Sequence, residues 1–433
     1  MARDALRGRH ERAVGILRFG DAGPEKECRK ANTNDSQPHD FANFFVCGAD
    51  TILRRSTHTT RGGNVVRRRH LVHALGALFL GATAAAFAQT PEPRAVYTAA
   101  CAACHGDDGR GRGASELGFD VPLPDFTDCD FAVREPDSDW YAIAHRGGPI
   151  RGFDRLMPAF GEALQREEIE AALARIRTFC TDARWPRGEL NLPRALFTEK
   201  AYPEDEAVIS TTLVGEGPDS ITHEFVWEQR FGPLNQIELK IPITRTDLGD
   251  PDGWKSGAGD LGLGVKHTMR HSLERGAILA VGGELVLPTG DETRGFGKGT
   301  TVLESFVLYG KILPRDAFVQ FQGVLEFPND SALEDEAVFR AALGKTWTLD
   351  TPFGRSFTPM IEVLAARELA GGAQTQWDLV PQLQVSLNKR QHVLGAVGVR
   401  QPVTDRDNRS TELVFYLLWD WFDGGVLEGW SRR

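Results

Sequence analysis

From about Ala207 onward, apolar and polar residues alternate in runs of roughly ten residues. In NQIELKIPIT, Ile237, Leu239 and Ile241 share one face, and the polar residues between them take the other. AFVQFQGVLEF and QWDLVPQLQVSLN repeat this pattern further along the chain. Because a period of two is that of an extended strand and not of a helix, the second half of the chain is predicted to be β-structure.

About twelve such runs occupy residues 206–422, and the connections between them alternate in length. Short turns such as GPL, HSLER and PRD are interspersed with longer, often acidic links such as RTDLGDPDGWKS and GDETRGFGKGT. Short turns at one end and long loops at the other are typical of bacterial outer-membrane barrels. We therefore predict an antiparallel transmembrane β-barrel of about twelve strands, with its first and last strands starting and ending in the periplasm and a C-terminal tail at 423–433. The alternative is a soluble β-sandwich, whose strands also alternate.

A barrel in a membrane requires one face of each strand to meet lipid and the other to meet the lumen. The lipid face is predicted to include Ile237, Leu239, Phe321, Leu383 and Leu417, and the lumen face Glu238, Gln320 and Gln384. A wider polar set suits a wet interior: Glu224, Glu228, Arg230, Asp260, Lys266, Glu284, Gln320, Gln322, Glu326, Arg340 and Gln382.

An export signal lies upstream at residues 65–88. Arg67, Arg68 and Arg69 form a basic region, residues 71–87 are a short apolar run, and AFA-QT is a small-residue cleavage pattern that predicts a mature start near Gln89. A membrane anchor is the alternative for this run. Residues 1–64 are interpreted as a non-native extension, translated from a misplaced start, or as a disordered one. The net charge of −10 and the pI of about 5.6 argue against a nucleic-acid partner.

The most specific chemical signal is CAACH at residues 101–105. In C-x-x-C-H, both thiols attach a c-type haem covalently and the histidine becomes the proximal iron ligand, here Cys101, Cys104 and His105. C-x-x-C alone also suits a thiol redox pair or half of a zinc site. Covalent haem attachment takes place outside the cytoplasm, so the export signal supports the first interpretation. One covalent haem c is predicted.

A second axial ligand is predicted in the stretch LMPAFG. Met157 stands 52 positions after His105 and is one of only four methionines in the chain. His/Met ligation raises the reduction potential and leaves no open iron position for a substrate. The alternatives are that Met157 packs in the core, or that His145 is the ligand instead.

Residues 89–182 are predicted to form a small all-α unit, with helices near 95–106, 137–145 and 165–179. Besides Cys101 and Cys104, the part of the chain after the export signal contains only Cys129 and Cys180. In an oxidising compartment these two are candidates for a disulfide, and two buried free thiols are the alternative.

Residues 93–182 resemble a class I cytochrome c. The resemblance lies in CAACHG, a tryptophan-bearing middle helix, a GG-containing loop, LMPAFG and a C-terminal helix. It implies thioether bonds at Cys101 and Cys104, with His105 and Met157 as axial ligands. The pair Cys129 and Cys180 departs from the pattern, because most such domains lack it. Separately, GGELVLPTGDETRGFGKGT resembles an outer-membrane barrel family associated with meta-pathway phenol degradation, and this resemblance implies no substrate here.

The expected architecture is a cytochrome joined by a linker at 183–205 to the barrel. The predicted function is one-electron transfer at the periplasmic mouth of the barrel, by an electron-transfer protein and not an enzyme, with periplasmic electron carriers and outer-membrane lipid as partners. The apolar band of a barrel, about 25 Å tall, is too tall for one haem to bridge unaided. Two alternatives remain: a channel for a small solute with the cytochrome as gate, sensor or partner domain, or a protein similar to the fused cytochrome–porins that take up electrons from extracellular iron.

Overall fold

The computed structural model describes residues 91–121, 123–215, 219–249, 251–348 and 356–423. The predicted extension at 1–64, the predicted signal peptide at 65–88 and all but the first residue of the predicted tail lie outside these ranges. Within them, no helix has both the length and the apolar character needed to cross a membrane.

The first part of the described chain is a small helical unit. Its α-helices are α1 (Pro93–Ala100), α2 (Ala102–His105), α3 (Ala114–Leu117), α4 (Cys129–Ala132), α5 (Asp137–Arg146) and α6 (Arg166–Arg177). The expected helix at 95–106 is interrupted at Cys101, which separates α1 from α2. Helix α6 begins with a capping box between Gln165 and Glu168 and contributes Ile169 and Ile176 to the core. Tyr97 of α1 lies in the same core, so the first and last long helices are held together.

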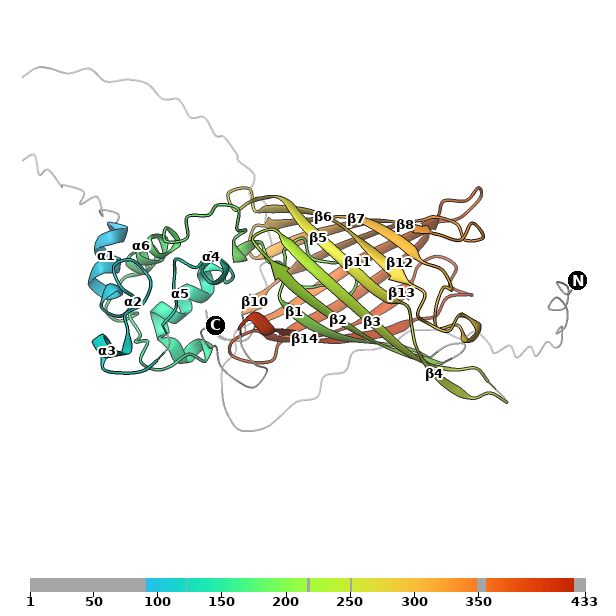
Figure 1. Cartoon of the computed structure of the whole chain (residues 1–433), viewed down its shortest axis with the longest axis horizontal. Helices are drawn as coiled ribbons and strands as arrows, with labels where there is room; N and C mark the ends of the chain where they lie inside the picture. Colours follow the sequence, from blue (N-terminus) through green and yellow to red (C-terminus); the bar gives the residue numbers. More distant parts are fainter. Residues whose placement is uncertain (1–90, 122, 216–218, 250, 349–355, 424–433) are drawn as a thin grey trace, which may run out of the picture. The chain divides into compact units, whose positions relative to one another are not determined.

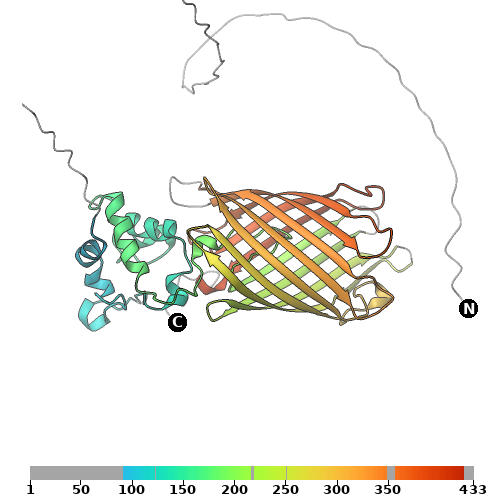
Figure 2. The ribbon, with the colours of Figure 1, turned by 90° about the horizontal axis from the view of Figure 1, so that it is seen from above.

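The second part is one antiparallel sheet that closes on itself (Figures 1 and 2). Its strands are β1 (Glu206–Val214), β2 (Ser220–Phe231), β3 (Asn235–Asp247), β4 (Trp254–Ala258), β5 (Leu261–Ser272), β6 (Ala277–Leu287), β7 (Val302–Leu313), β8 (Ala317–Pro328), β9 (Glu336–Lys345), β10 (Trp347–Thr348), β11 (Ser356–Glu368), β12 (Gln376–Ser386), β13 (Val393–Pro402) and β14 (Glu412–Asp420). Segments β4 and β5 follow one another along β3, and β9 and β10 follow one another along β11, so the fourteen segments form twelve barrel strands.

Pairing of the first and last strands closes the barrel. Strand β1 pairs with β14 from Glu206 opposite Asp420 to Val214 opposite Glu412. A β-sandwich has no such closure, so the sandwich alternative is wrong and the predicted barrel is confirmed. The connections at 232–234, 273–276 and 314–316 are short and share one end, which we call the short-turn end. Those at 288–301, 329–335, 369–375 and 403–411 are longer and share the opposite, long-loop end.

Side chains are sorted across the barrel wall as the alternation predicts. Ile237, Phe321 and Leu417 point outward and are exposed, whereas their neighbours Gln236 and Gln320 point inward and are buried. An apolar outer face with a polar inner face is the reverse of a soluble barrel and suits a surrounding of lipid.

The lumen contains a segment of the chain itself. We call residues 190–205, which immediately precede β1, the plug segment. Leu190 packs against the inward-facing Ile278 and Leu308, and Thr198 and Tyr202 are each only 1% exposed. The stretch predicted as a linker at 183–205 is therefore not a free tether over most of its length. Several of the lumen-facing polar side chains bind the plug segment, Lys266 and Gln320 among them.

Candidate functional site

The CAACH motif lies at the junction of α1 and α2. The backbone N–H groups of Cys104 and His105 both donate to the carbonyl of Cys101, at 3.2 and 3.0 Å. Helix α2 ends at Gly106, whose φ of 75° lies in the region that favours glycine. The buried Tyr97 hydroxyl donates to the carbonyl of Gly106 at 2.7 Å, so the motif is fixed to the domain core.

One apolar cavity of about 220 Å³ brings the predicted haem residues together. Cys101, Cys104, His105 and Met157 all line it. Most of the other lining side chains are aliphatic or aromatic, Trp140 of α5 among them. His105 and Met157, 52 positions apart in sequence, thus share one mostly apolar cavity.

The environment of His105 suits a metal ligand. Its ring stacks on Phe126 with centroids 5.0 Å apart, and burial lowers the pKa of His105 to about 4, so the imidazole is neutral at neutral pH. The buried Nδ1 atom has no hydrogen-bond partner among the described residues. Burial also raises the pKa of the Cys101 thiol to about 11, which keeps this sulfur protonated at neutral pH.

The loop that carries Met157 is fixed to the end of α5. Gly148 N–H donates to the carbonyl of Met157 at 3.0 Å, and Phe160 N–H donates to the carbonyl of Ala144 at 2.9 Å. Gly147 has a φ of 82°, and a Cβ atom there would lie 3.0 Å from the Met157 carbonyl oxygen. The glycine pair noted in the sequence therefore lets the methionine loop approach the helix closely.

The alternative ligand His145 lies elsewhere. It is absent from the residues that line the cavity, and its ring stacks on Tyr141 with centroids 5.5 Å apart. A Cβ atom on Gly161 would lie 2.7 Å from the His145 ring, so this ring packs under the methionine loop instead of facing the cavity. The placement favours Met157 over His145.

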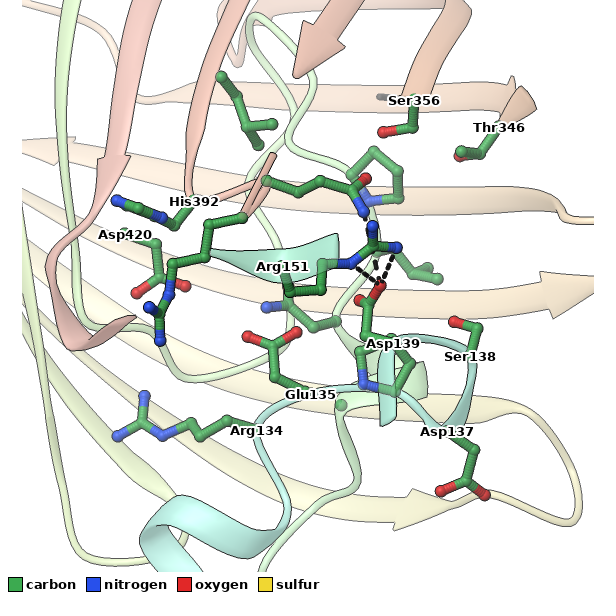
Figure 3. A pocket seen from close by; sticks show the side chains of 18 of the residues that line it. Arg134, Glu135, Asp137, Ser138, Asp139, Arg151, Thr346, Ser356, His392 and Asp420 are labelled. Atoms are coloured by element: carbon green, nitrogen blue, oxygen red, sulfur yellow. Dashed lines mark hydrogen bonds and ion pairs between the residues drawn. The ribbon is translucent and has the colours of Figure 1, made fainter. Parts of the chain in front are cut away.

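A buried arginine that sequence reasoning did not single out borders the same cavity. Arg151 is 5% exposed, and its Nε and Nη2 donate to Asp139 at 2.9 and 2.6 Å, while Nη1 has no partner among the described residues. Figure 3 shows the pair in a second cavity of about 810 Å³ that Arg151 also lines. Nothing in the sequence distinguishes Arg151 from other arginines, because its burial depends on the tertiary structure.

The cavity fits the group that the motif implies. Two thiols that can bond to the porphyrin, and an imidazole and a thioether that can bind the iron, are the side chains that a c-type haem requires, and the apolar walls suit a porphyrin. The free Nη1 of Arg151 at the cavity edge suits a carboxylate such as a haem propionate.

Cys129 and Cys180 lie next to one another in the helical unit. Their sulfur atoms are 2.13 Å apart and their Cα atoms 4.9 Å apart. The pair connects the first residue of α4 to the chain just after α6. The segment between them, residues 130–179, contains α5 and the methionine loop.

Comparisons with known proteins agree with this division of the chain. The family model described as cytochrome C oxidase, cbb3-type, subunit III matches residues 88–174, and this match implies haem c binding. No curated protein matches the sequence.

Among solved structures, an outer membrane channel from Pseudomonas putida F1 is similar, with 15% identity, a TM-score of 0.38, and coverage of 53% of this chain and 99% of that one. LpxR from Salmonella typhimurium is similar at 9% identity and a TM-score of 0.33, covering 49% of this chain and 99% of that one. The KdgM porin is similar at 8% identity and a TM-score of 0.32, covering 49% and 98%. At these TM-scores the likeness adds nothing to the barrel that strand pairing already defines.

The fold and the family match together define the class of protein. The chain carries a cytochrome c-type domain followed by a closed, twelve-stranded antiparallel β-barrel. It is a fused cytochrome–barrel protein.

Proposed function

We propose that this protein is a monohaem c-type cytochrome anchored to the outer membrane by its barrel, and that it exchanges single electrons with periplasmic carriers. The observation that carries the proposal is the apolar cavity that Cys101, Cys104, His105 and Met157 line together. A haem bound there supplies one-electron exchange at its iron.

The residues of the cavity have separate roles in this proposal. The sulfurs of Cys101 and Cys104 would attach the haem, and His105 and Met157 would hold its iron. Iron held by both His105 and Met157 would have no open site for oxygen or peroxide, which favours electron transfer over oxidase or peroxidase chemistry. Helices α1, α5 and α6 contribute apolar side chains to the cavity wall, and an apolar site reduces the solvent reorganisation that accompanies a change of charge.

The barrel is proposed to span the outer membrane with its short-turn end in the periplasm. The exposed apolar outer face supports a lipid surrounding, and short periplasmic turns are the rule for bacterial barrels. The plug segment enters β1 at Glu206 on this same end, so the cytochrome lies on the periplasmic side, where covalent haem attachment takes place. The pairing of Cys129 with Cys180 suits an oxidising compartment.

Electron exchange is proposed to stay on one side of the membrane. The sequence has a single C-x-x-C-H motif, and the apolar band of a barrel is about 25 Å tall. A second carrier would be needed to cross that distance. The barrel therefore acts as an anchor for the cytochrome in this proposal.

The haem assignment is tested by staining denaturing gels for haem peroxidase activity. The full-length protein should stain at its own mass, and the double variant Cys101→Ser/Cys104→Ser should not. The variant Cys129→Ser/Cys180→Ser is the matched control and should still stain. Staining of the Cys101/Cys104 double variant would refute covalent attachment.

Proteoliposomes that hold the reduced protein with the cytochrome facing outward test whether electron exchange stays on one side of the membrane. An impermeant oxidant added outside should oxidise the haem rapidly. The same oxidant trapped inside should leave the haem reduced. Oxidation from the trapped side, with no leakage of the oxidant, would show an electron path through the barrel and contradict the anchor proposal.

A further inference from the structure

The tip of the plug segment is held by side chains from three different barrel strands. The N–H groups of Phe197 and Thr198 donate to the Glu362 carboxylate at 3.1 and 2.7 Å, and the Thr198 hydroxyl donates to it at 2.6 Å. Glu362 belongs to β11 and has no exposed surface. On either side, Leu196 N–H donates to Gln382 Oε1 at 3.0 Å, and Glu199 N–H donates to Gln322 Oε1 at 3.1 Å.

The carbonyl groups of the plug segment are satisfied in the same way. Gln320 Nε2 donates to the carbonyl of Pro193 at 2.8 Å, and the Tyr416 hydroxyl donates to that of Arg194 at 2.7 Å. Lys266 Nζ donates to the carbonyl of Lys200 at 2.9 Å. Buried backbone groups need partners, and here lumen side chains supply them in place of water or a neighbouring strand. The segment is thus a built part of the barrel interior.

Buried ion pairs hold the charged residues of the plug segment. Arg194 lies 2.6 Å from Glu206 and 3.1 Å from Glu228, and Lys200 pairs with Glu206 at 3.0 Å. These side chains are at most 12% exposed. Removing one member of such a pair leaves an uncompensated buried charge, so the pairs resist extraction of the segment.

One group of carboxylates in the lumen looks at first like a cation site. Glu199 of the plug segment, Glu238 and Glu284 have carboxylate oxygens within 4.8 Å of one another. Lys240 Nζ lies 2.9, 2.9 and 2.6 Å from these three carboxylates. The lysine binds all three carboxylates and so ties Glu199 of the plug segment to the barrel wall.

From these contacts we propose that residues 190–205 are a built-in plug that keeps the barrel closed, and that the barrel becomes a cation-selective pore when the plug is released. This goes beyond the electron-transfer proposal, since it concerns the lumen and holds whether or not the haem transfers electrons. Because the plug is continuous with the cytochrome domain, a movement of that domain would act directly on the closure.

The selectivity follows from the strand register. Seven inward-facing glutamates lie along one line of directly paired or nearly paired positions: Glu228, Glu238, Glu284, Glu304, Glu326, Glu336 and Glu368. Between Glu238 and Glu284 stands Gly264, the register partner of both. Like charges directly opposite one another destabilise a sheet. Lys240, which pairs with Glu238 and Glu284, and Lys298, which pairs with Glu326, offset only part of the charge of this line.

This line runs from one barrel end to the other because the strands are tilted. Glu228 lies near the short-turn end of β2, whereas Glu336 and Glu368 lie at the long-loop ends of β9 and β11. Rings or rows of carboxylates favour cations in pores. An opened lumen would therefore pass cations in preference to anions.

The test is single-channel conductance of the full-length protein in planar lipid bilayers. Wild-type protein should stay at the closed level. Glu362→Gln places an amide N–H₂ against the N–H groups of the plug tip and removes the charge that held them. We expect it to raise the open fraction about tenfold or more, since hydrogen bonds to a charged group are lost. Glu334→Gln is the matched control, because this exposed residue lies in the connection 329–335 at the long-loop end, outside the glutamate line and away from the plug segment.

A second variant protects the test against partial effects of a single substitution. In it, residues 194–199 are replaced by glycine and serine at equal length. Haem staining and slower migration on gels after heating show that the barrel and the cytochrome have folded. A reversal potential in a potassium chloride gradient should then report a cation preference.

Each outcome decides the proposal. Closed wild-type protein and open, cation-selective plug variants support it. Wild-type conductance equal to that of the glycine–serine variant would show that residues 190–205 do not close the lumen. A folded glycine–serine variant that stays closed would show that the barrel wall is closed by itself. An anion preference would overturn the role of the glutamate line.

Discussion

Removing the pair Cys129 and Cys180 should destabilise the cytochrome domain without affecting the barrel. The two residues are 51 positions apart, so a disulfide between them closes a loop of about that length. In the chain-entropy model, such a loop contributes about 4 kcal/mol by restricting the unfolded chain. The haem-attachment cysteines lie before the loop and Met157 lies within it. A disulfide therefore restrains the part of the unfolded chain that must fold to bring Met157 close to His105.

The assay follows the sulfur-to-iron absorption band in the near infrared while guanidinium is raised. This band reports only the methionine loop, so unfolding of the cytochrome domain is measured separately from the barrel. The double variant Cys129→Ala/Cys180→Ala should lose about 4 kcal/mol of unfolding free energy relative to wild type. Reduced wild-type protein should approach the value of the variant, which controls for the loss of side-chain volume.

Two results would contradict this reasoning. Wild-type protein whose Cys129 and Cys180 are both alkylated without reductant has no disulfide. A double variant whose unfolding free energy lies within about 1 kcal/mol of wild type would show that the loop is already restrained in the unfolded chain.

Three further outcomes are expected. Met157→Ala should abolish the near-infrared band, lower the reduction potential and let carbon monoxide bind, whereas His145→Ala should leave the band in place; the reverse result would name His145 as the ligand. Phe321→Arg changes a residue near the middle of β8 on the outer face. It should lower the free energy of unfolding, measured with urea in lipid vesicles, by about 2–4 kcal/mol, and an unchanged value would argue against lipid contact. Arg134→Ala removes the guanidinium that lies 2.5 Å from the carboxylate of buried Asp205. The free energy of unfolding, measured by thermal unfolding, should fall by about 3–5 kcal/mol, and Arg134→Lys should recover part of that loss.

Much of the candidate site could be predicted because its chemistry is local in sequence. Cys101, Cys104 and His105 are neighbours along the chain, and one turn of helix suffices to present them together. That Met157 and not His145 lines the same cavity depends on the fold of the loop against α5. Arg151 gave no signal, since only the tertiary structure buries it beside Asp139.

The lumen shows the limit of pattern reasoning. Period-two alternation assigns Gln320 and Glu362 correctly to the inner face, but it does not say what fills the interior. The variant Gln320→Arg, which a wet lumen would tolerate, should instead deprive the carbonyl of Pro193 of its hydrogen-bond donor. The plug segment has no periodicity of its own, because its partners are side chains far away in sequence, such as Glu362, 164 positions after Thr198.

The sequence by itself determined the class of each half of the chain. For the first half it showed the haem motif and the helices. For the second it showed the strand pattern, the alternation of short and long loops, and which side chains face inward and outward. These follow from local spacing, which fixes which side chains share a face. The tertiary structure alone decided that the barrel closes through β1 and β14, that its lumen holds residues 190–205, and that seven glutamates on different strands stand in one line. Those features depend on register and stagger between strands, and no local pattern along the chain records them.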